Sequence, residues 1–422
     1  MSVSYLKPSL FESASPHLFA QNSQVSPYPQ NSPPRKAFQP DKEKQFINEK
    51  KDKLINDFYE KYLKNASQKD NFKKVTYADG ASYIGQMSND TIKQGKGIYT
   101  YPNGDQYLGD WKDDIFNGKG IYIFTIGEIY EGELQNGYKH GIGSYYYSNG
   151  NFYEGEWFED KKENRGIYIY KTTGEKYEGL WKNGERHGKG TYYYAFGDKY
   201  EGEWENGFKS GFGILYYSSG AQYEGEWQRD LANGKGTMNY ANKDRYEGEW
   251  FDGVKQGYGI YFFKDGGRFE GDWLRDYMNG MGQFNSANGD VYQGEFKEGE
   301  KSGVGVIQYA NGDLYEGEFQ NDKIHGLGTM TIQNGDIYSG EWKQGVKSGR
   351  GQYQFASQDV YEGYWANGIR QGKGIYKWKT GETFIGEWKA DKMNGFGQFI
   401  KVDGTVYEGF LQNDMVVKND AI

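Results

Sequence analysis

The sequence has no cysteine, no long hydrophobic run and few apolar residues apart from aromatic ones. Without cysteine the chain has no disulfide, no thiolate metal site, no cysteine nucleophile and no site for palmitoylation. No apolar run reaches the ~18 residues that a membrane-spanning helix needs, and the N-terminus lacks the apolar core of a signal peptide. These absences favour a soluble intracellular protein, and we expect it in the cytoplasm.

The composition also limits the core and the partners. Apolar residues make up 36% of the chain and aromatic residues 18%, so the core is built from tyrosine, tryptophan and phenylalanine rather than leucine. Such a thin core suits a single-layer sheet better than a sandwich or barrel. Residues 1–80 carry 13 basic and 9 acidic side chains, and the net charge of −9 leaves about −13 on the rest. An acidic body lacks the basic footprint of a nucleic-acid-binding protein, so we expect no nucleic acid among the partners.

One pentapeptide, Y-E-G-E-W, organises most of the chain. It begins at Tyr200 and returns 23 residues later at Tyr223 and again at Tyr246. Variants of it recur fifteen times between Tyr83 and Tyr407, always 23 or 24 residues apart. A period this regular indicates a repeat architecture, in which each unit contacts only its neighbours.

Each repeat is predicted to be one β-hairpin. Side chains alternate along a strand, so Tyr200, Gly202 and Trp204 share one face. Asn206-Gly207 is a strong signal for a two-residue hairpin turn. Closing the hairpin there predicts Tyr200 opposite Gly213, Gly202 opposite Gly211 and Trp204 opposite Lys209. The glycines would then leave room for a neighbouring ring to lie over them.

The predicted fold class is therefore all-β, an elongated single-layer antiparallel sheet of about fifteen consecutive hairpins, roughly 140 Å long at ~4.8 Å per strand. We expect the repeat array over residues 75–411 and a C-terminal tail over 412–422. The predicted structural aromatics are the leading tyrosines and tryptophans of successive repeats, namely Tyr177, Trp181, Tyr200, Trp204, Tyr223, Trp227, Tyr246 and Trp250.

The N-terminal part differs from the array. Residues 1–40 are rich in serine, proline, glutamine and asparagine and are predicted to be disordered. Residues 41–65 predict an amphipathic helix. Its apolar stripe consists of Phe46, Ile47, Leu54, Ile55, Phe58, Tyr59, Tyr62 and Leu63. This helix either docks on the first hairpin as a cap, which we favour, or binds a partner.

The repeat resembles the MORN repeat family. The residues that carry the resemblance are Tyr177–Trp181 (Y-E-G-L-W) followed by His187–Gly190 (H-G-K-G), with counterparts from Tyr83 to Leu411. Met87 replaces the tryptophan of the first copy, and the fourth copy has Asn164 and an extra turn residue where its first glycine is expected.

The resemblance implies a non-enzymatic structural scaffold. Such proteins occur in cytoskeletal assemblies, including axonemal radial spokes of cilia and flagella, so it implies protein partners and a location at the cytoskeleton or in a cilium or flagellum. An alternative function is docking to phosphoinositides at a membrane surface. Membrane docking needs clustered lysine and arginine, whereas the array is acidic with interleaved signs, so only weak phosphoinositide binding is kept as an alternative.

No residue pattern predicts catalysis, and we expect no catalytic, cofactor-binding or metal-binding residue. His140, His187 and His325 occupy one turn position in separate repeats, far apart along the array, and His17 lies in the leader. Gly-x-Gly recurs inside strands with no helix behind it, so it does not predict a nucleotide site.

The face opposite the aromatic residues holds two predicted features. The register above places Glu178 opposite Lys189, Glu224 opposite Lys235 and Glu362 opposite Lys373, as cross-strand ion pairs. Four successive repeats instead carry an apolar residue between the two glycines, namely Tyr258, Met281, Val304 and Leu327. We hypothesise that these four form a partner-binding or self-association stripe; the alternative is that loops cover them.

The last repeat is predicted to contribute one strand only, from Tyr407 to Leu411. An unpaired strand is a template for another chain. We therefore hypothesise that two molecules associate through Tyr407 and Leu411 as a homodimer, which is also what the family resemblance implies.

Overall fold

The structure is a computed structural model that describes residues 40–65 and 71–417. The described residues divide into two compact units, with the boundary between Ala241 and Asn242. Below, residues 40–241 are the first unit and residues 242–417 the second. The predicted disordered leader lies outside the described residues except for Pro40. No helix in the described part is long and apolar enough to cross a membrane.

The first unit begins with the helix α1 (Pro40–Phe58), which continues as the short π-helical segment η2 (Tyr59–Leu63). Strands follow in sequence order. They are β1 (Phe72–Thr76), β2 (Ser82–Ser88), β3 (Ile92–Thr100), β4 (Gln106–Lys112), β5 (Ile115–Ile123), β6 (Ile129–Gln135), β7 (Tyr138–Tyr146), β8 (Phe152–Phe158), β9 (Lys161–Tyr170), β10 (Glu175–Lys182), β11 (Glu185–Tyr193), β12 (Lys199–Glu205), β13 (Phe208–Tyr216), β14 (Gln222–Gln228) and β15 (Leu231–Asn239).

The second unit consists of strands and turns alone, as far as it is described. Its strands are β16 (Arg245–Phe251), β17 (Val254–Phe262), β18 (Arg268–Leu274), β19 (Tyr277–Asn285), β20 (Val291–Lys297), β21 (Glu300–Gln308), β22 (Leu314–Gln320), β23 (Lys323–Thr331), β24 (Ile337–Lys343), β25 (Val346–Gln354), β26 (Val360–Ala366), β27 (Ile369–Lys377), β28 (Thr383–Lys389), β29 (Lys392–Ile400), β30 (Val406–Gln412) and β31 (Met415–Val416).

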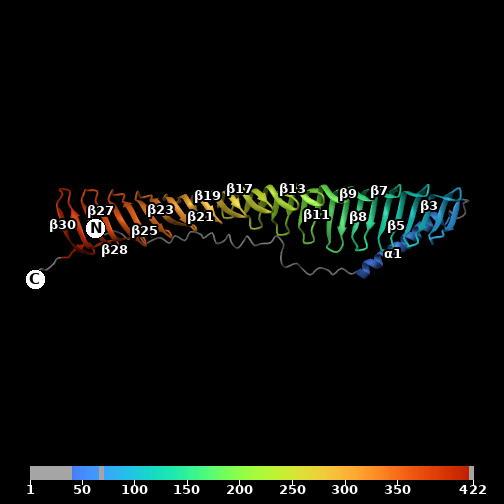
Figure 1. The fold of residues 1–422 in the computed structure, drawn as a ribbon, viewed down its shortest axis with the longest axis horizontal. Helices are drawn as coiled ribbons and strands as arrows, with labels where there is room; N and C mark the ends of the chain where they lie inside the picture. The colour runs from blue at the N-terminus through green and yellow to red at the C-terminus, as the bar shows by residue number, and fades with distance from the viewer. Residues whose placement is uncertain (1–39, 66–70, 418–422) are drawn as a thin grey trace. The chain divides into compact units, whose positions relative to one another are not determined.

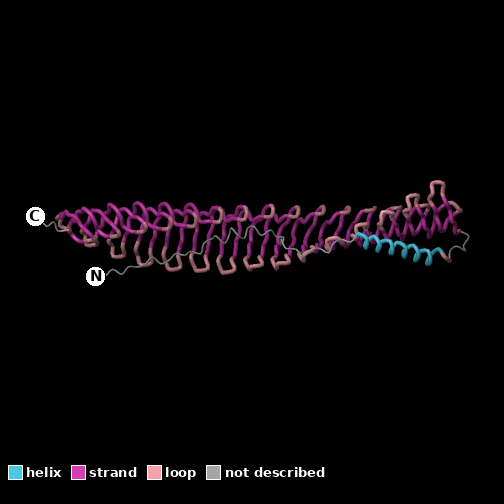
Figure 2. Tube along the Cα trace, turned by 90° about the horizontal axis from the view of Figure 1, so that it is seen from below, coloured by secondary structure: helices cyan, strands magenta, loops and turns pink. Residues whose placement is uncertain are grey.

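Within each unit, consecutive strands pair antiparallel and form successive hairpins. Figure 1 shows the strands of each unit standing side by side in one layer, and Figure 2 shows the turns lining both edges of that layer. The predicted all-β, single-layer antiparallel architecture with one short helix is confirmed.

The hairpin register differs from the prediction in the middle of each repeat. Trp204 lies opposite Lys209 as predicted, but Gly202 pairs with Gly213 and Tyr200 with Leu215. The predicted pairings of Gly202 with Gly211 and of Tyr200 with Gly213 are therefore wrong. Gly211 has a φ of +59° and bulges out of the ladder together with the residue after it. A β-bulge of this kind uses glycine because the left-handed conformation disfavours a side chain.

On the aromatic face a ring lies over Gly202 and Gly213 as predicted, whereas Gly211, for which a covering ring was also predicted, lies under the Glu203 carboxylate. A Cβ at Gly202 or at Gly213 would overlap the ring of Tyr200. The ring is held there because its hydroxyl donates a hydrogen bond to the Glu203 carbonyl oxygen at 3.0 Å. Glycine is thus required at both positions by the tyrosine that covers them.

Tryptophan joins one repeat to the next. Trp204 stands edge-on between Tyr177 of the preceding repeat and Tyr200 of its own, with ring centroids at 5.4 and 5.2 Å. Its indole N–H donates to the Gly190 carbonyl oxygen of the preceding repeat at 3.2 Å. Edge-to-face pairs are worth about 0.5–1.5 kcal/mol each beyond their buried area. The leading tyrosines at 177, 200, 223 and 246 are at most 2% exposed, so the core of each unit runs along this single face.

The helix packs on the opposite face, called here the outward face and marked by Glu201 and Glu203. Phe58 and Leu63 are buried against Ile98, Leu108 and Ile123 of β3, β4 and β5. Further along the helix, the Lys50 amino group lies 3.6 Å from a Glu131 carboxylate oxygen on β6. The helix therefore lies across several strands, where it covers an apolar part of the outward face, rather than on the first hairpin alone.

Candidate protein-interaction surface

The bulge determines which side chain each repeat presents on the outward face. The residue after the bulge glycine, called here the bulge residue, pairs with the next strand beyond its own hairpin, as Phe212 pairs with Glu226. Glu226 alternates with Gly225 and Trp227, so it and its partner point away from the aromatic face. Bulge residues and their acidic partners therefore form one row along the outward face.

The four residues of the predicted stripe are bulge residues of the second unit. Their exposed fractions are 50% for Tyr258, 56% for Met281 and 61% for both Val304 and Leu327. The described turns therefore leave these side chains open to solvent. Each faces an acidic residue across the ladder, in the pairs Tyr258–Asp272, Met281–Glu295, Val304–Glu318 and Leu327–Glu341. The stripe is therefore a row in which apolar and acidic side chains alternate.

The acidic residues of this row also hold the bulges in place. The Leu327 N–H donates to a Glu318 carboxylate oxygen at 3.1 Å, and the Met281 N–H donates to Asp272 at 3.1 Å. Each carboxylate lies over the bulge glycine of its own hairpin, as Glu318 lies over Gly326. A Cβ on that glycine would displace the carboxylate. The carboxylates are thus fixed in position between the apolar side chains.

In the first unit, lysine often takes the bulge position. Lys96 forms an ion pair with Asp110 at 2.7 Å across the ladder, and Lys189 lies opposite Glu203. The predicted cross-strand pairs Glu178–Lys189, Glu224–Lys235 and Glu362–Lys373 are wrong. Glu178 lies opposite Thr191, because the bulge puts each of these lysines in register with a strand of the following hairpin. The same shift places Glu224 opposite Thr237 and Glu362 opposite Ile375.

The acidic residues of the stripe have no such partner. Within the described residues, no lysine or arginine forms an ion pair with Asp272, Glu295, Glu318 or Glu341. Arg350 nevertheless lies close enough to Glu341 for its charge to interact with that carboxylate. The stripe therefore presents exposed apolar area beside carboxylates that form no ion pair.

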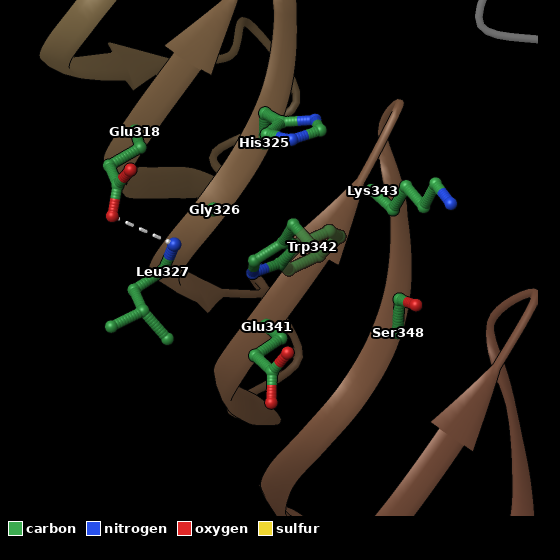
Figure 3. Close-up of a pocket in the computed structure, with 8 residues that line it drawn as sticks. All are labelled: Glu318, His325, Gly326, Leu327, Glu341, Trp342, Lys343 and Ser348. Carbon is green, nitrogen blue, oxygen red and sulfur yellow. Dashed lines mark hydrogen bonds between the residues drawn. The ribbon is translucent and has the colours of Figure 1, made fainter.

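An open cavity of about 590 Å³ lies beside Leu327 (Figure 3). It is lined by Glu318, His325, Gly326, Leu327, Glu341, Trp342, Lys343 and Ser348. The Nδ1 atom of His325 is buried there without a hydrogen-bond partner. Among the described residues, no group of three or more histidine, aspartate or glutamate side chains is placed to hold a metal ion. The cavity is thus a recess next to the stripe, large enough for a side chain of a partner.

The last repeat is the least covered part of the array. Tyr407 is 52% exposed, whereas the leading aromatics of the earlier repeats are buried. No tryptophan of a further repeat lies over it among the described residues. The strand prediction is incomplete here, because β31 follows β30 and pairs with it through Leu411 and Val416. Phe410, Met415 and Val416 are also exposed, so this end of the second unit carries an apolar surface.

Comparison with known proteins identifies the family. The MORN repeat matches fourteen consecutive copies across residues 83–406, with only residues 175 and 176 unmatched between the fourth and fifth copies. This chain belongs to the MORN repeat family. No curated protein matches it.

Solved structures add no further information. One neighbour is the TCP10 domain of Danio rerio CPAP in complex with a STIL peptide, with 10% identity over 69% of this chain and 92% of that chain and a TM-score of 0.17. Another is the Drosophila melanogaster SAS-4 TCP domain bound to a proline-rich motif of Ana2, with 15% identity over 54% and 90% and a TM-score of 0.18. A virginiamycin B lyase from Staphylococcus aureus follows at 12% identity over 82% and 86%, with a TM-score of 0.12. Likenesses at these TM-scores carry no argument about this chain.

Proposed function

We propose that this chain is a structural scaffold that links proteins in a cytoskeletal assembly, such as that of a cilium or flagellum, and that it associates with itself. A MORN repeat array is a repeat scaffold for protein or membrane interaction and is typically not an enzyme. The observation that carries the choice of protein partners is the stripe, in which four apolar side chains are at least half exposed beside carboxylates that form no ion pair within the described residues. Such a row attracts a partner with apolar and basic side chains and repels an anionic membrane.

Liposome flotation separates the two interaction classes. We expect the full chain to remain in the dense bottom fraction, and not to float, when it is mixed with phosphoinositide-containing liposomes. Salt-sensitive flotation with those liposomes, and not with neutral ones, would favour membrane docking instead.

Self-association is assigned to the last repeat, through Tyr407 and Leu411. Tyr407 is exposed on the aromatic face, and Phe410 and Met415 are exposed on the outward face of the same strands, so a second copy joined at this end of the sheet would cover side chains on both faces. Multi-angle light scattering should give the mass of two chains for the native protein and of one chain for Tyr407→Glu/Met415→Lys.

The matched control is Phe212→Glu, at a side chain that is 51% exposed in the first unit. It should leave the mass unchanged. A dimer that persists in Tyr407→Glu/Met415→Lys would exclude this surface as the interface.

A further inference from the structure

The helix of the first unit is an example of a segment that the outward face binds. In the first unit, α1 and η2 lie across β2 to β7 on this face, and Phe58 and Leu63 are buried against its apolar side chains. At the other end of the contact, the Lys50 amino group lies 4.2 Å from the centre of the Tyr146 ring and 3.6 Å from the Glu131 carboxylate. An amphipathic helix with an apolar ridge and lysines beside it therefore fits this face of a MORN sheet.

The helix contacts the rows beside the bulge residues, since Ile98 and Leu108 face one another two residues beyond Lys96. The stripe in the second unit offers the same two kinds of side chain, apolar and acidic, in the row of the bulge residues, and no helix lies over it among the described residues. Its apolar side chains stand on every second strand, about 9.6 Å apart, with a carboxylate about midway between them. Two turns of an α-helix rise about 10.8 Å and one turn about 5.4 Å. A helix that lies along the array can therefore place apolar residues near each stripe residue and basic residues near each carboxylate.

The length of the stripe defines the length of such a helix. From Tyr258 on β17 to Leu327 on β23 there are six strand spacings, about 29 Å in all. A helix of about 19 residues covers that distance. The neighbouring row on the same face contains the facing pairs Gln283–Gln293 and Thr329–Ser339, whose uncharged side chains cost less to cover than charged ones, and one carboxylate between them, Glu316.

We propose that the stripe of the second unit binds an amphipathic α-helix of a partner protein, with an apolar ridge flanked by lysine or arginine. This inference rests on the proposed scaffold function and names the chemistry of its partner. The ridge covers Met281, Val304 and Leu327, and one of its side chains enters the cavity beside Leu327. The flanking cations lie at Glu295 and Glu318, which form no ion pair within the described residues.

An extended proline-rich peptide is the main competitor. A polyproline II segment repeats every ~9.3 Å, which also matches the spacing of the stripe. The bound helix on the first unit, and the carboxylates midway between the apolar residues, favour the α-helix.

The test uses the full chain and three labelled peptides of about 20 residues, followed by fluorescence anisotropy and circular dichroism. The first peptide has leucines along one helical face and lysines on both flanks, the second has glutamates on the flanks, and the third has two prolines at its centre. We expect the lysine-flanked peptide to bind and to gain helicity, with at least tenfold weaker binding by the other two. Equal binding of the proline peptide, or of the glutamate peptide, would overturn the proposal.

Met281→Lys/Val304→Lys tests the location. Lysine occupies the same bulge position at Lys119 and Lys189, so the variant is expected to fold, and hydrogen exchange of β19 to β22 checks this. It should weaken binding of the lysine-flanked peptide at least tenfold, whereas Phe212→Lys in the first unit should not. Unchanged binding in the folded double variant would refute the site.

The same samples keep the two proposals separate. If no peptide binds while light scattering still shows a dimer that ignores liposomes, the helix site fails and the scaffold function remains. If the chain floats with phosphoinositide liposomes, the scaffold function fails whatever the peptides do.

Discussion

The two units share one backbone design and differ in how basic and apolar residues are distributed over the bulge position. In most repeats of both, the bulge glycine is followed by a residue that faces a carboxylate on the next hairpin; Arg350, which faces Tyr364, is an exception. In the first unit lysine recurs here at Lys96, Lys119 and Lys189, interrupted by Ile142 and Phe212. In the second unit four successive repeats are apolar, from Tyr258 to Leu327. The binding chemistry of a repeat can therefore change without a change of its fold, because the bulge residue contributes to the surface and not to the aromatic core.

The largest effect should come from the glycine pairs, and it should be equal in both units. Gly213→Ala in the first unit and Gly305→Ala in the second each drive a methyl group into the covering tyrosine ring. We expect about 3 kcal/mol of local destabilisation for each. Hydrogen exchange of the affected hairpin measures it. A loss confined to one unit would mean that the two backbones are not equivalent.

A smaller effect should come from the basic residues above the tryptophans. Lys162 and Lys347 lie over Trp181 and Trp365 at 4.2 and 4.4 Å, and burial lowers the pKa of each amine to about 8. Met278 and Met393 fill the equivalent positions elsewhere. Since the cost of holding a buried charge exceeds the ~0.5–2 kcal/mol of a cation–π contact, we expect Lys347→Met to stabilise by about 1 kcal/mol at pH 7. Lys162→Met in the first unit should do the same.

The pH dependence checks the cause of that effect. The folded-state pKa of Lys347 lies below the usual 10.5, so the unfolded chain binds more protons and stability rises with pH from about 8 upward. The gain from Lys347→Met should therefore shrink between pH 7 and 9.5 in chemical denaturation. Arg370→Met is the matched control, since its guanidinium donates to Asp391 at 2.7 and 3.2 Å. It should destabilise by about 1 kcal/mol.

The smallest effect should come from exchanging the bulge residues themselves. Val304→Lys adds a cross-strand pair with Glu318 in the second unit, and Lys119→Val removes the pair with Glu133 in the first. We expect Val304→Lys to raise the free energy of unfolding by about 0.5 kcal/mol and Lys119→Val to lower it by about 0.5 kcal/mol. Thermal unfolding at two salt concentrations measures both. A change above ~2 kcal/mol in either variant would show that the bulge residue does contribute to the core.

The sequence predicted most of the fold because its period is strict. The repeat spacing and the Asn206-Gly207 turn were sufficient for the hairpins and for the pairing of Trp204 with Lys209. The spacing of the glycines also indicated a ring over Gly202 and over Gly213, although not that these two glycines pair. Where each aromatic side chain points follows from strand alternation alone, which needs no knowledge of the partner strand.

The bulge could not be predicted in this way, because glycine fits both an extended strand and a left-handed conformation. Asn164, read as a departure from the pattern, was the available signal. It replaces the first glycine in one repeat with a φ of +50°, and asparagine is among the few residues that tolerate this region. The missed bulge is why the predicted glutamate–lysine pairs were wrong by one hairpin.

The surface was predicted only in part, for a different reason. Tyr258, Met281, Val304 and Leu327 share one repeat position, so periodicity alone placed them in a row. Their carboxylate neighbours depend on the register beyond the bulge. The place of the helix on β2 to β7 depends on side chains from several repeats, such as Ile98, Leu108 and Ile123, that have no common repeat signature.

The indole hydrogen bond from Trp204 back to Gly190 has a consequence for how such a chain changes over time. Each interior repeat receives its cover from the copy after it and covers the copy before it, so any interior copy is replaceable by another. Duplication or loss of a whole 23-residue segment would therefore preserve every tyrosine–tryptophan contact. Length can be inherited in whole-repeat steps, while single substitutions at the bulge position alter binding specificity without disturbing the core.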